Sequence, residues 1–261
     1  MALTRLIRGV YNKVLQTRHI EQKRMTTLEE KIYNHGERLI PGVTHDSMEV
    51  IRHKSSYNFF RKVIGRDLEF RVNIGESHII NIVDLGCGVG HGCLMLSTLR
   101  KSRITGIDSF PECLEYAQQH YARENIVYRI EDLNTFIPEM PEYDYIVSRG
   151  VFEHIANGLE VVGILTKWRY RLLFDVPYDE PEGANPHHVL WGIREEHFAS
   201  LRDAELFFQD LSGVIYDRAQ KPAKPNMIIC VCSRPDLPRV SSGTITFPLP
   251  AWQPETELDQ K

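Results

Sequence analysis

The sequence predicts an α/β fold built on a mostly parallel β-sheet, and three observations lead to this prediction. Four of the five residues from Ile79 to Val83 are β-branched and apolar, which is typical of a central strand covered on both faces. A glycine-rich turn and a helical stretch from Cys93 to Leu99 follow directly. Short apolar strands then keep alternating with helical segments up to residue 176, and this alternation is typical of a parallel sheet.

The turn after the first strand has an acidic residue followed by glycines at every second position, Asp84-x-Gly86-x-Gly88-x-Gly90, with Cys87 inside it. Glycines let the backbone approach a ligand closely, and the helix that begins here adds unpaired N–H groups. A dinucleotide-binding loop needs G-x-G-x-x-G, which no register of this turn supplies. An acidic residue here would repel a pyrophosphate, but it can pair with an ammonium group. A glycine turn without a ligand is the alternative.

This turn resembles motif I of the class I S-adenosylmethionine (SAM) dependent methyltransferases, whose ligand carries an amino-acid moiety. The resemblance extends over about residues 30–233. It implies a three-layer αβα Rossmann-like sandwich with a mostly parallel seven-stranded sheet, in which the last strand, near residues 227–232, is antiparallel. It also implies SAM as the cofactor, bound by the turn residues Asp84, Gly86, Cys87, Gly88 and Gly90.

The second strand, near residues 104–107, ends in Asp108. A carboxylate about 20 residues after the glycine turn is where such folds hold ribose hydroxyls, because it can accept from both hydroxyls at once. Asp108 can also be the N-cap of a helix over residues 111–121, since Ser109 and Pro111 are good helix-start signals as well. Both roles are compatible if Ser109 is the cap, so we expect Asp108 and Ser109 at the cofactor.

Two further strand ends complete the expected cofactor site. Glu131-Asp132-Leu133 resembles the third SAM-binding segment of the class, which implies that Asp132 accepts from the adenine amino group. The Leu133 N–H would then meet a ring nitrogen. The fourth strand, near residues 143–150, carries Ser148 at its carboxyl end. We expect Ser148 at the cofactor as well, because ligands of such sheets bind at the carboxyl ends of strands.

Residues 26–66 read as a helical leader rich in aromatic and polar residues. The leader is similar to the segment that precedes the SAM domain in bacterial methyltransferases encoded with polysaccharide-biosynthesis enzymes, where it forms a partial lid. The resemblance therefore implies that Arg38, His53 and Tyr57 touch the methionine end of SAM or the methyl acceptor. A surface helix that simply covers the sheet is the alternative.

Three histidines are candidates for the base that removes a proton from a hydroxyl acceptor, because imidazole titrates near neutral pH. His154 follows the fourth strand, and His187 and His188 lie in the loop after the fifth. We favour His188, since a residue beside a strand end more often supports the SAM loop. Adjacent histidines point in different directions in an extended chain, and the sequence has no H-E-x-x-H motif, so we expect no metal site. Histidines that tie down loop backbone are the alternative.

Composition excludes some functions. Of the 261 residues, 42% are hydrophobic and 25% are charged, and the net charge is −4. A general nucleic-acid binder is usually basic, so we expect no nucleic-acid partner. The five cysteines show neither a C-x-x-C metal spacing nor the framework of a secreted protein. We therefore expect them to be buried free thiols in the reducing environment of the cytoplasm.

The chain is expected to have four parts. Residues 1–25 read as a basic amphipathic helix, which can lie on an anionic membrane surface or pack on the domain or a partner subunit. The leader at 26–66 and a SAM-binding domain at 67–233 follow. Residues 234–261 are rich in proline and polar residues, and we expect them to be a loosely packed tail.

Together these patterns predict a SAM-dependent methyltransferase that O-methylates a sugar or glycan-like small molecule in the bacterial cytoplasm. The sulfonium of SAM is already electrophilic, so the protein has mainly to align the acceptor and remove its proton. Methylation of a lipid or another metabolite is one alternative, which the basic N-terminal helix would suit. A SAM-binding module without turnover is another, and the intact glycines with Asp108 and Asp132 argue against it.

If residues 1–25 lie on anionic lipid, deleting them should abolish co-sedimentation with anionic vesicles and leave SAM binding intact. Binding of the full-length chain should weaken as salt rises, because the basic face supplies part of the attraction. Neutral vesicles are the control. A full-length chain that does not sediment with anionic vesicles at low salt would identify the segment as a packing or oligomer helix instead.

Overall fold

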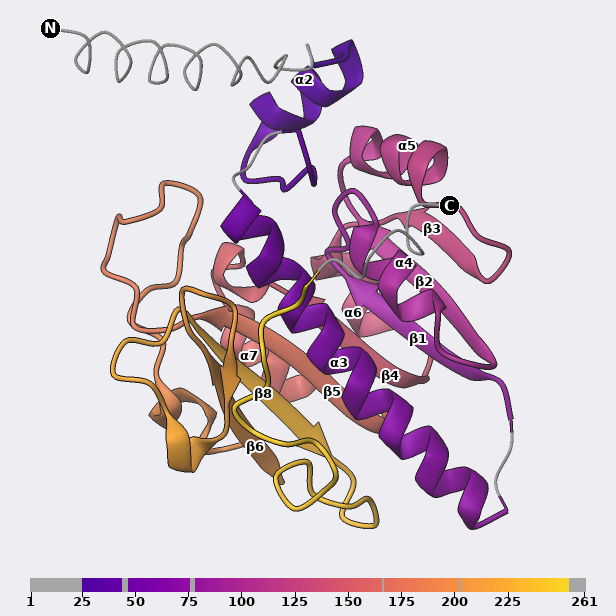
Figure 1. Cartoon of the computed structure of the whole chain (residues 1–261). Helices are drawn as coiled ribbons and strands as arrows, with labels where there is room; N and C mark the ends of the chain where they lie inside the picture. Colours follow the sequence, from indigo (N-terminus) through magenta and orange to yellow (C-terminus); the bar gives the residue numbers. More distant parts are fainter. Residues whose placement is uncertain (1–24, 44–46, 76–77, 166, 202, 254–261) are drawn as a thin grey trace, which may run out of the picture.

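Strands and helices alternate along the chain, as Figure 1 shows for the computed structural model. The structure describes residues 25–43, 47–75, 78–165, 167–201 and 203–253. The strands are β1 (Ile80–Leu85), β2 (Ser102–Asp108), β3 (Ile126–Ile130), β4 (Tyr143–Arg149), β5 (Trp168–Pro177), β6 (Ala204–Gln209), β7 (Ile215–Tyr216) and β8 (Met227–Ser233). The α-helices are α2 (Thr27–His35), α3 (Ser47–Asn73), α4 (His91–Ser97), α5 (Pro111–His120), α6 (Leu133–Glu139) and α7 (Gly158–Ile164). Three short 3₁₀ helices are η1 (Phe152–His154), η2 (Glu195–Phe198) and η3 (Arg218–Gln220).

All eight of these strands join one sheet in the order β3-β2-β1-β4-β5-β8-β6-β7. The first five in this order are parallel, and β8 runs antiparallel between β5 and β6. The predicted mostly parallel α/β sheet with an antiparallel last strand is therefore confirmed. The sheet has eight strands where seven were predicted. The additional strand is β7, which has two residues and pairs with β6 at the edge of the sheet.

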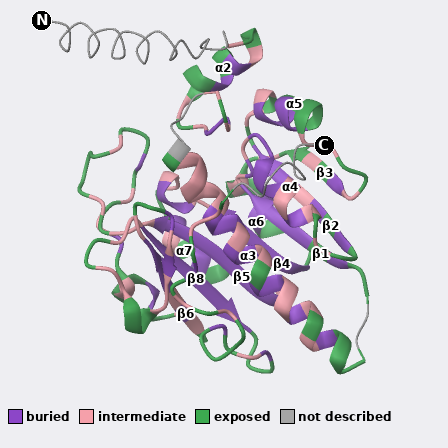
Figure 2. Cartoon of the chain, viewed as in Figure 1, coloured by how far each residue is buried: buried purple, intermediate pink, exposed green. Residues whose placement is uncertain are grey.

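Different helices cover the two faces of the sheet, and the central strands between them are buried (Figure 2). On one face, Phe60 of α3 packs in the same cluster as Ile82 of β1. On the other face, Phe136 of α6 and Val161 of α7 pack in the cluster that contains Val83 of β1. Neighbouring residues of β1 thus enter opposite cores, which explains why its sequence is apolar almost without alternation.

The leader continues into the domain without a break. Thr26 and Glu29 form a capping box at the start of α2, in which each side chain accepts from the other residue's N–H, and this satisfies two otherwise unpaired donors. The next helix, α3, runs from Ser47 to Asn73, so the boundary expected at residue 66 lies inside it. The amphipathic segment at residues 1–24 lies outside the described part of the chain. In that part, no helix is long and apolar enough to cross a membrane.

The segment after β8 packs against the domain, so the expectation of a loosely packed tail is wrong for residues 234–253. Leu237 and Val240 are buried in the core cluster that includes α3. Arg66 of α3 donates to the carbonyl oxygens of Val240 and Arg239 at 3.1 and 2.7 Å. Sequence periodicity could not show this, because isolated apolar residues in irregular backbone repeat with no fixed spacing. The five cysteines, all within the described residues, are free and buried as predicted.

A buried ion pair joins α3 to the sheet. The Arg171 guanidinium of β5 is completely buried and donates to both carboxylate oxygens of Asp67, from Nε at 2.6 Å and from Nη2 at 2.8 Å. It also donates to the Ser233 hydroxyl of β8 and to the Pro238 carbonyl. The pair therefore ties α3, β5, β8 and the C-terminal segment together at one point.

Replacing Asp67 with alanine should lower the free energy of unfolding by about 3–5 kcal/mol, because it leaves the Arg171 charge buried and unpaired. Chemical denaturation measures the change. Glu69→Ala, at an exposed position of the same helix, is the matched control and should stay within about 0.5 kcal/mol of the parent. The double variant Asp67→Ala, Arg171→Met should recover part of the loss. A change below about 1 kcal/mol for Asp67→Ala would contradict this account of the pair.

Candidate active site

The candidate cofactor site lies at the carboxyl ends of β1 and β2, where the glycine-rich turn leads into α4. Gly86, Gly88 and Gly90 have positive φ angles of 72°, 53° and 87°, a conformation that favours glycine. A Cβ on Gly86 would lie 2.4 Å from a methyl group of Val151. A Cβ on Gly88 would meet no atom of the described residues within 4 Å, and Gly88 lines a cavity. A ligand can therefore approach its backbone closely.

Asp108, at the end of β2, holds the glycine turn in place. Its Oδ2 accepts from the Gly88 N–H at 2.9 Å, and its Oδ1 accepts from the Phe110 N–H at 3.0 Å, just before α5. The carboxylate is buried and lines the same cavity, and carboxylate oxygens can each accept more than one hydrogen bond. Asp108 thus organises both turns, and its oxygens can still accept from ribose hydroxyls. The contact with the ribose stays a prediction.

Asp84 is completely buried and does not line the cavity. Both of its carboxylate oxygens are 3.2 Å from the Tyr57 hydroxyl, which donates to them, and the Cys93 thiol donates to Oδ2 at 3.3 Å. Burial raises the pKa of Asp84 to about 7, against the lowering effect of the bonds from Cys93 and Tyr57. Tyr57 does line the cavity, so it mediates between Asp84 and the cofactor site.

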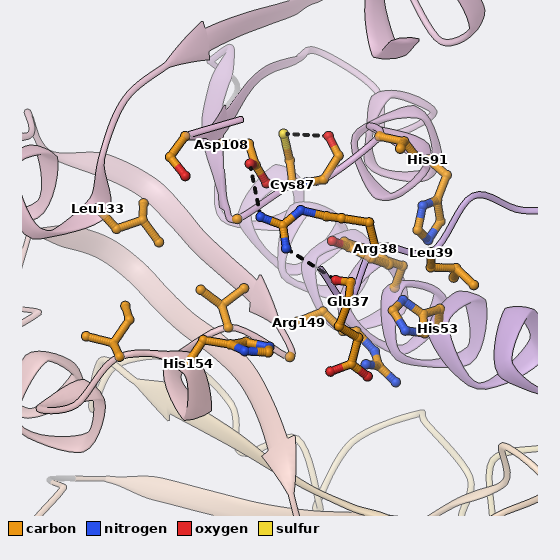
Figure 3. A pocket seen from close by; sticks show the side chains of 18 of the residues that line it. Glu37, Arg38, Leu39, His53, Cys87, His91, Asp108, Leu133, Arg149 and His154 are labelled. Carbon is orange, nitrogen blue, oxygen red and sulfur yellow. Dashed lines mark hydrogen bonds and ion pairs between the residues drawn. The ribbon is translucent and has the colours of Figure 1, made fainter. Parts of the chain in front are cut away.

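Several buried polar atoms on the cavity wall have no hydrogen-bond partner among the described residues. They are Nε of Arg38, Nε of Arg149 and both ring nitrogens of His91 (Figure 3). Burial lowers the pKa of His91 well below its usual value, so its ring is neutral. The two arginine nitrogens are donors, of which Nε of Arg149 lies 3.9 Å from Oδ2 of Asp175, and the neutral His91 ring has one donor and one acceptor. Buried polar atoms without hydrogen bonds are costly, and these indicate a ligand with polar groups. Together with the acceptor Asp108, this set fits SAM, whose amino-acid end has a carboxylate and whose ribose has two hydroxyls.

The structure brings most of the predicted cofactor residues to this cavity. Its wall includes Arg38, Tyr57, Gly86, Cys87, Gly88, Asp108, Ser109, Asp132 and Leu133. Asp132 is also the N-cap of α6, and its contact with adenine stays a prediction.

Asp84, Ser148 and Gly90 are the three predicted cofactor residues that do not line this cavity. Ser148 is buried, and its hydroxyl donates to the Leu85 carbonyl at 3.0 Å, so it joins β4 to β1 and is not on the cavity wall. Gly90 is the left-handed residue before α4. A Cβ there would lie 2.6 Å from the Tyr128 hydroxyl, which makes Gly90 a packing requirement of the turn.

A second cavity opens beside the first. Six residues line both cavities: Glu37, Leu39, His53, Arg149, Gly150 and His154. The loops after β4 and β5 and the segment before β8 supply the rest of the polar wall, including Glu153, Tyr178, Glu180, His188, Lys224 and Asn226. Since Glu37 and His53 come from the leader and α3, these elements lie over the junction of the two cavities.

His188 lies in the second cavity between two carboxylates. Its Nδ1 is 2.5 Å from Oε2 of Glu180, and its Nε2 is 3.2 Å from Oε2 of Glu37. Burial lowers the pKa of His188, but the hydrogen bonds with Glu37 and Glu180 outweigh it and raise the pKa to about 9. The same contact with His188 lowers the pKa of Glu37 to about 2. A histidine that holds its proton at neutral pH is a poor base, which argues against the preference for His188.

The pKa of His154 is shifted in the opposite direction to that of His188. Its Nδ1 is 2.9 Å from the carbonyl oxygen of His187, so Nδ1 carries the hydrogen and Nε2 is left as an acceptor. Burial is the main cause that lowers the pKa of His154. The side chain of His187 is exposed, so this residue contributes its backbone. Of the three histidines, His154 is therefore the one suited to receive a proton.

Glu37, His91, Arg149 and Glu153 are site residues that the sequence did not predict. Glu153 directly precedes His154, a predicted candidate base. No spacing pattern marks the other three, because they come from the leader, the start of α4 and the end of β4 and meet only in the folded chain.

The fold and this cavity define the class of protein. Residues 82–169 match the family described as methyltransferase domain. Residues 82–169 thus carry a methyltransferase domain, a kind of domain for which SAM is the cofactor.

Two curated relatives share part of the chain. A malonyl-[acyl-carrier protein] O-methyltransferase of Bacillus cereus is 33% identical over 88 residues, which are 33% of this chain and 32% of the relative. A ubiquinone biosynthesis O-methyltransferase of Xanthomonas campestris pv. campestris is 25% identical over 161 residues, which are 52% of this chain and 66% of the relative. The chain thus spans about a third of the first relative and just under two thirds of the second.

Solved structures show the same fold. The N-terminal domain of EvdMO1 with SAH bound has a TM-score of 0.51 and 14% identity, covering 85% of this chain and 96% of that domain. The plantazolicin methyltransferase BpumL in complex with SAH also has a TM-score of 0.51 and 14% identity, covering 79% of this chain and 90% of that one.

Asp108→Ala should weaken SAM binding by about 1.5–3 kcal/mol, because it removes a charged acceptor for the ribose hydroxyls. Titration calorimetry with SAM measures the change, and circular dichroism checks that the variant is folded. Glu115→Ala, exposed on the neighbouring α5, should bind SAM like the parent. A folded Asp108→Ala variant with unchanged affinity would remove Asp108 from the cofactor site.

Asp84 should make the folded protein less stable as the pH rises. Its carboxyl keeps a proton up to about pH 7 in the folded chain but loses it near pH 4 in an unfolded one. Because the folded state binds the extra proton, the free energy of unfolding should fall across this range, by up to about 1.4 kcal/mol per pH unit. The titratable groups that face Asp84 are Tyr57, Cys93 and Asp108.

Asp84→Asn cannot ionise, so it should lose this part of the pH dependence. Denaturant titrations of both proteins at pH 5 and pH 8 compare the two slopes. If the parent and the variant lose stability in parallel between these pH values, Asp84 does not carry the buried proton.

Proposed function

We propose that this chain transfers the methyl group of SAM to an oxygen atom of a sugar or glycan-like small molecule. The observation that carries the proposal is the second cavity, which meets the cofactor cavity at His154. An acceptor bound there would have its reacting group at the end of the cofactor site. Both curated relatives are named O-methyltransferases, which supports an oxygen as the acceptor atom.

The chemistry of the second cavity favours an acceptor with many hydroxyl groups. Most of its lining side chains are polar, with the carboxylates of Glu37, Asp179 and Glu180 on one hand and Lys224 and Asn226 on the other. A sugar can donate to the carboxylates and accept from the ammonium and amide groups. An apolar lipid would exclude water from these polar groups and offer them no hydrogen bonds, which costs free energy.

Different residues of the chain then have different roles in the reaction. When bound, SAM supplies an electrophilic methyl group, and Asp108 and the Gly88 backbone hold the cofactor. The polar wall of the second cavity orients the acceptor. Holding the reacting atoms in line lowers the activation barrier. As the acceptor oxygen bonds to the methyl carbon and the carbon–sulfur bond breaks, Nε2 of His154 receives the hydroxyl proton.

Sugar nucleotides and lipid-linked glycans, offered with labelled SAM, test the proposal. A hydroxyl-rich acceptor should drive release of S-adenosylhomocysteine and carry the label. His154→Ala should then lower kcat by about 10²–10⁴ and leave SAM affinity unchanged. His120→Ala, at an exposed position of α5, is the matched control. Label that enters only an apolar lipid would favour the alternative acceptor, and SAM binding without turnover on any acceptor would favour an interaction module.

The free, buried cysteines suit a reducing compartment, so the proposed compartment is the bacterial cytoplasm. A sugar acceptor would make the reaction a step of polysaccharide biosynthesis. Peripheral contact with a membrane through residues 1–25 is part of the same proposal. If the glycan acceptor is linked to lipid, it is held at the membrane surface, and the contact would bring the enzyme close to it.

A further inference from the structure

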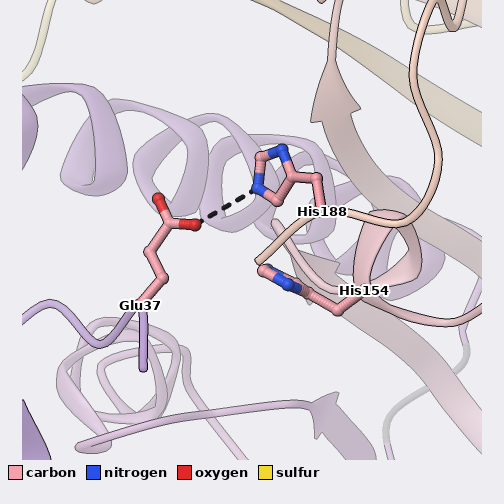
Figure 4. Close-up of side chains that lie close together, drawn as sticks. All are labelled: Glu37, His154 and His188. Atoms are coloured by element: carbon pink, nitrogen blue, oxygen red, sulfur yellow. Dashed lines mark ion pairs between the residues drawn. The ribbon is translucent and has the colours of Figure 1, made fainter. Parts of the chain in front are cut away.

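Glu37, His154 and His188 converge at the junction of the two cavities (Figure 4). One carboxylate oxygen and one nitrogen from each imidazole lie within 4.8 Å of one another. The three residues come from the loop before α3, from η1 and from the loop after β5. Two imidazoles with one carboxylate are a donor set that suits divalent transition-metal ions.

Both histidines are oriented as metal ligands usually are. Nδ1 of His188 contacts the Glu180 carboxylate at 2.5 Å, and Nδ1 of His154 contacts the His187 carbonyl at 2.9 Å. A metal-binding histidine commonly donates its other ring N–H to a carboxylate or a carbonyl, which fixes the tautomer and turns the remaining nitrogen toward the ion. The nitrogen that can face an ion is Nε2 in both residues. In His188 this nitrogen lies 3.2 Å from Oε2 of Glu37, and it would release its proton on binding the metal.

A buried carboxylate oxygen without a hydrogen-bond partner is a further sign of a ligand. The Glu153 side chain is 3% exposed, and its Oε1 lies 4.0 Å from Nε2 of His188. Its Oε2 has no hydrogen-bond partner among the residues that the structure describes. An unpaired buried carboxylate is costly, and a divalent cation next to it would offset that cost.

We propose that Glu37, His154 and His188 bind a divalent transition-metal ion such as Mn²⁺ or Zn²⁺, with Glu153 beside it. Tetrahedral coordination at typical metal–ligand lengths puts donor atoms about 3.4 Å apart. The Glu37–His188 pair is already 3.2 Å apart, and Nδ2 of Asn185 donates to the same Oε2 of Glu37 at 2.6 Å. The expectation of no metal considered the adjacent pair His187 and His188, whereas the fold pairs His188 with His154.

The catalytic consequence of this site rests on the proposed function. An ion at the junction can bind the acceptor hydroxyl oxygen and lower its pKa, as divalent metals do for bound water. His154 is then a ligand, and a water molecule of the solvent takes the proton. The methyl carbon bonds to the ionised oxygen, and the sulfur keeps the electron pair of the broken bond. With the ion bound, solvent water thus takes the proton that Nε2 of His154 receives in the metal-free chain.

The test measures the binding of Mn²⁺ to the full-length chain. The electron paramagnetic resonance signal of the free ion reports how much Mn²⁺ is bound. We expect one Mn²⁺ per chain, competed by Zn²⁺. His154→Ala and His188→Ala should each lose binding by at least about tenfold, and Glu180→Gln, which alters only the orienting carboxylate, by about 10–100-fold. His120→Ala, an exposed histidine elsewhere, should bind like the parent.

Absence of stoichiometric binding by the parent chain, or equal binding by the parent and both histidine variants, would overturn the proposed site. The measurement uses neither SAM nor an acceptor, so it is independent of turnover. Metal binding without methylation of any hydroxyl acceptor would contradict the proposed function alone. Turnover that survives chelation, in a chain that binds no Mn²⁺ or Zn²⁺, would contradict the metal site alone.

Discussion

The carboxylate of Asp108 is the contact on which the cofactor site depends. By accepting from the Gly88 and Phe110 N–H groups, it joins the turn after β1 to the turn after β2. The two turns meet because β1 and β2 are parallel neighbours, so their carboxyl ends lie at the same edge of the sheet. The left-handed glycine backbone is then held open toward the cavity, and the Arg38 guanidinium reaches within 3.8 Å of the same carboxylate.

Helix α3 connects this edge to the rest of the molecule. Near its C-terminal end, Asp67 is held by the buried Arg171. Three turns earlier Tyr57 donates to Asp84 below the glycine turn, and His53 lines both cavities. One helix therefore spans the structural anchor, the cofactor turn and the acceptor side. A change in the ion pair should thus alter the position of Tyr57 and His53 as well as the stability, because one continuous helix carries all three residues.

The two cavities carry different chemistry. The cofactor side presents buried nitrogens without hydrogen-bond partners among the described residues, from Arg38, Arg149 and His91, and the Asp108 carboxylate. The acceptor side presents carboxylates that surround His188. The carboxylate of an amino-acid end suits the first set, whereas hydroxyl groups or a cation suit the second. His154 belongs to both walls, so it is the point where cofactor and acceptor chemistry meet.

The sequence by itself determined the fold and the cofactor edge. β1, the glycine turn and Asp108 are local signals, since a buried strand, a left-handed turn and a strand-end carboxylate each depend on a few neighbouring residues. Only the tertiary structure decided the rest. Asp84 and Ser148 turned out to be buried partners of Tyr57 and Leu85, and the C-terminal segment packed on α3. Glu37, His154 and His188 are far apart in the sequence, and no local pattern records that three loops bring them within 4.8 Å.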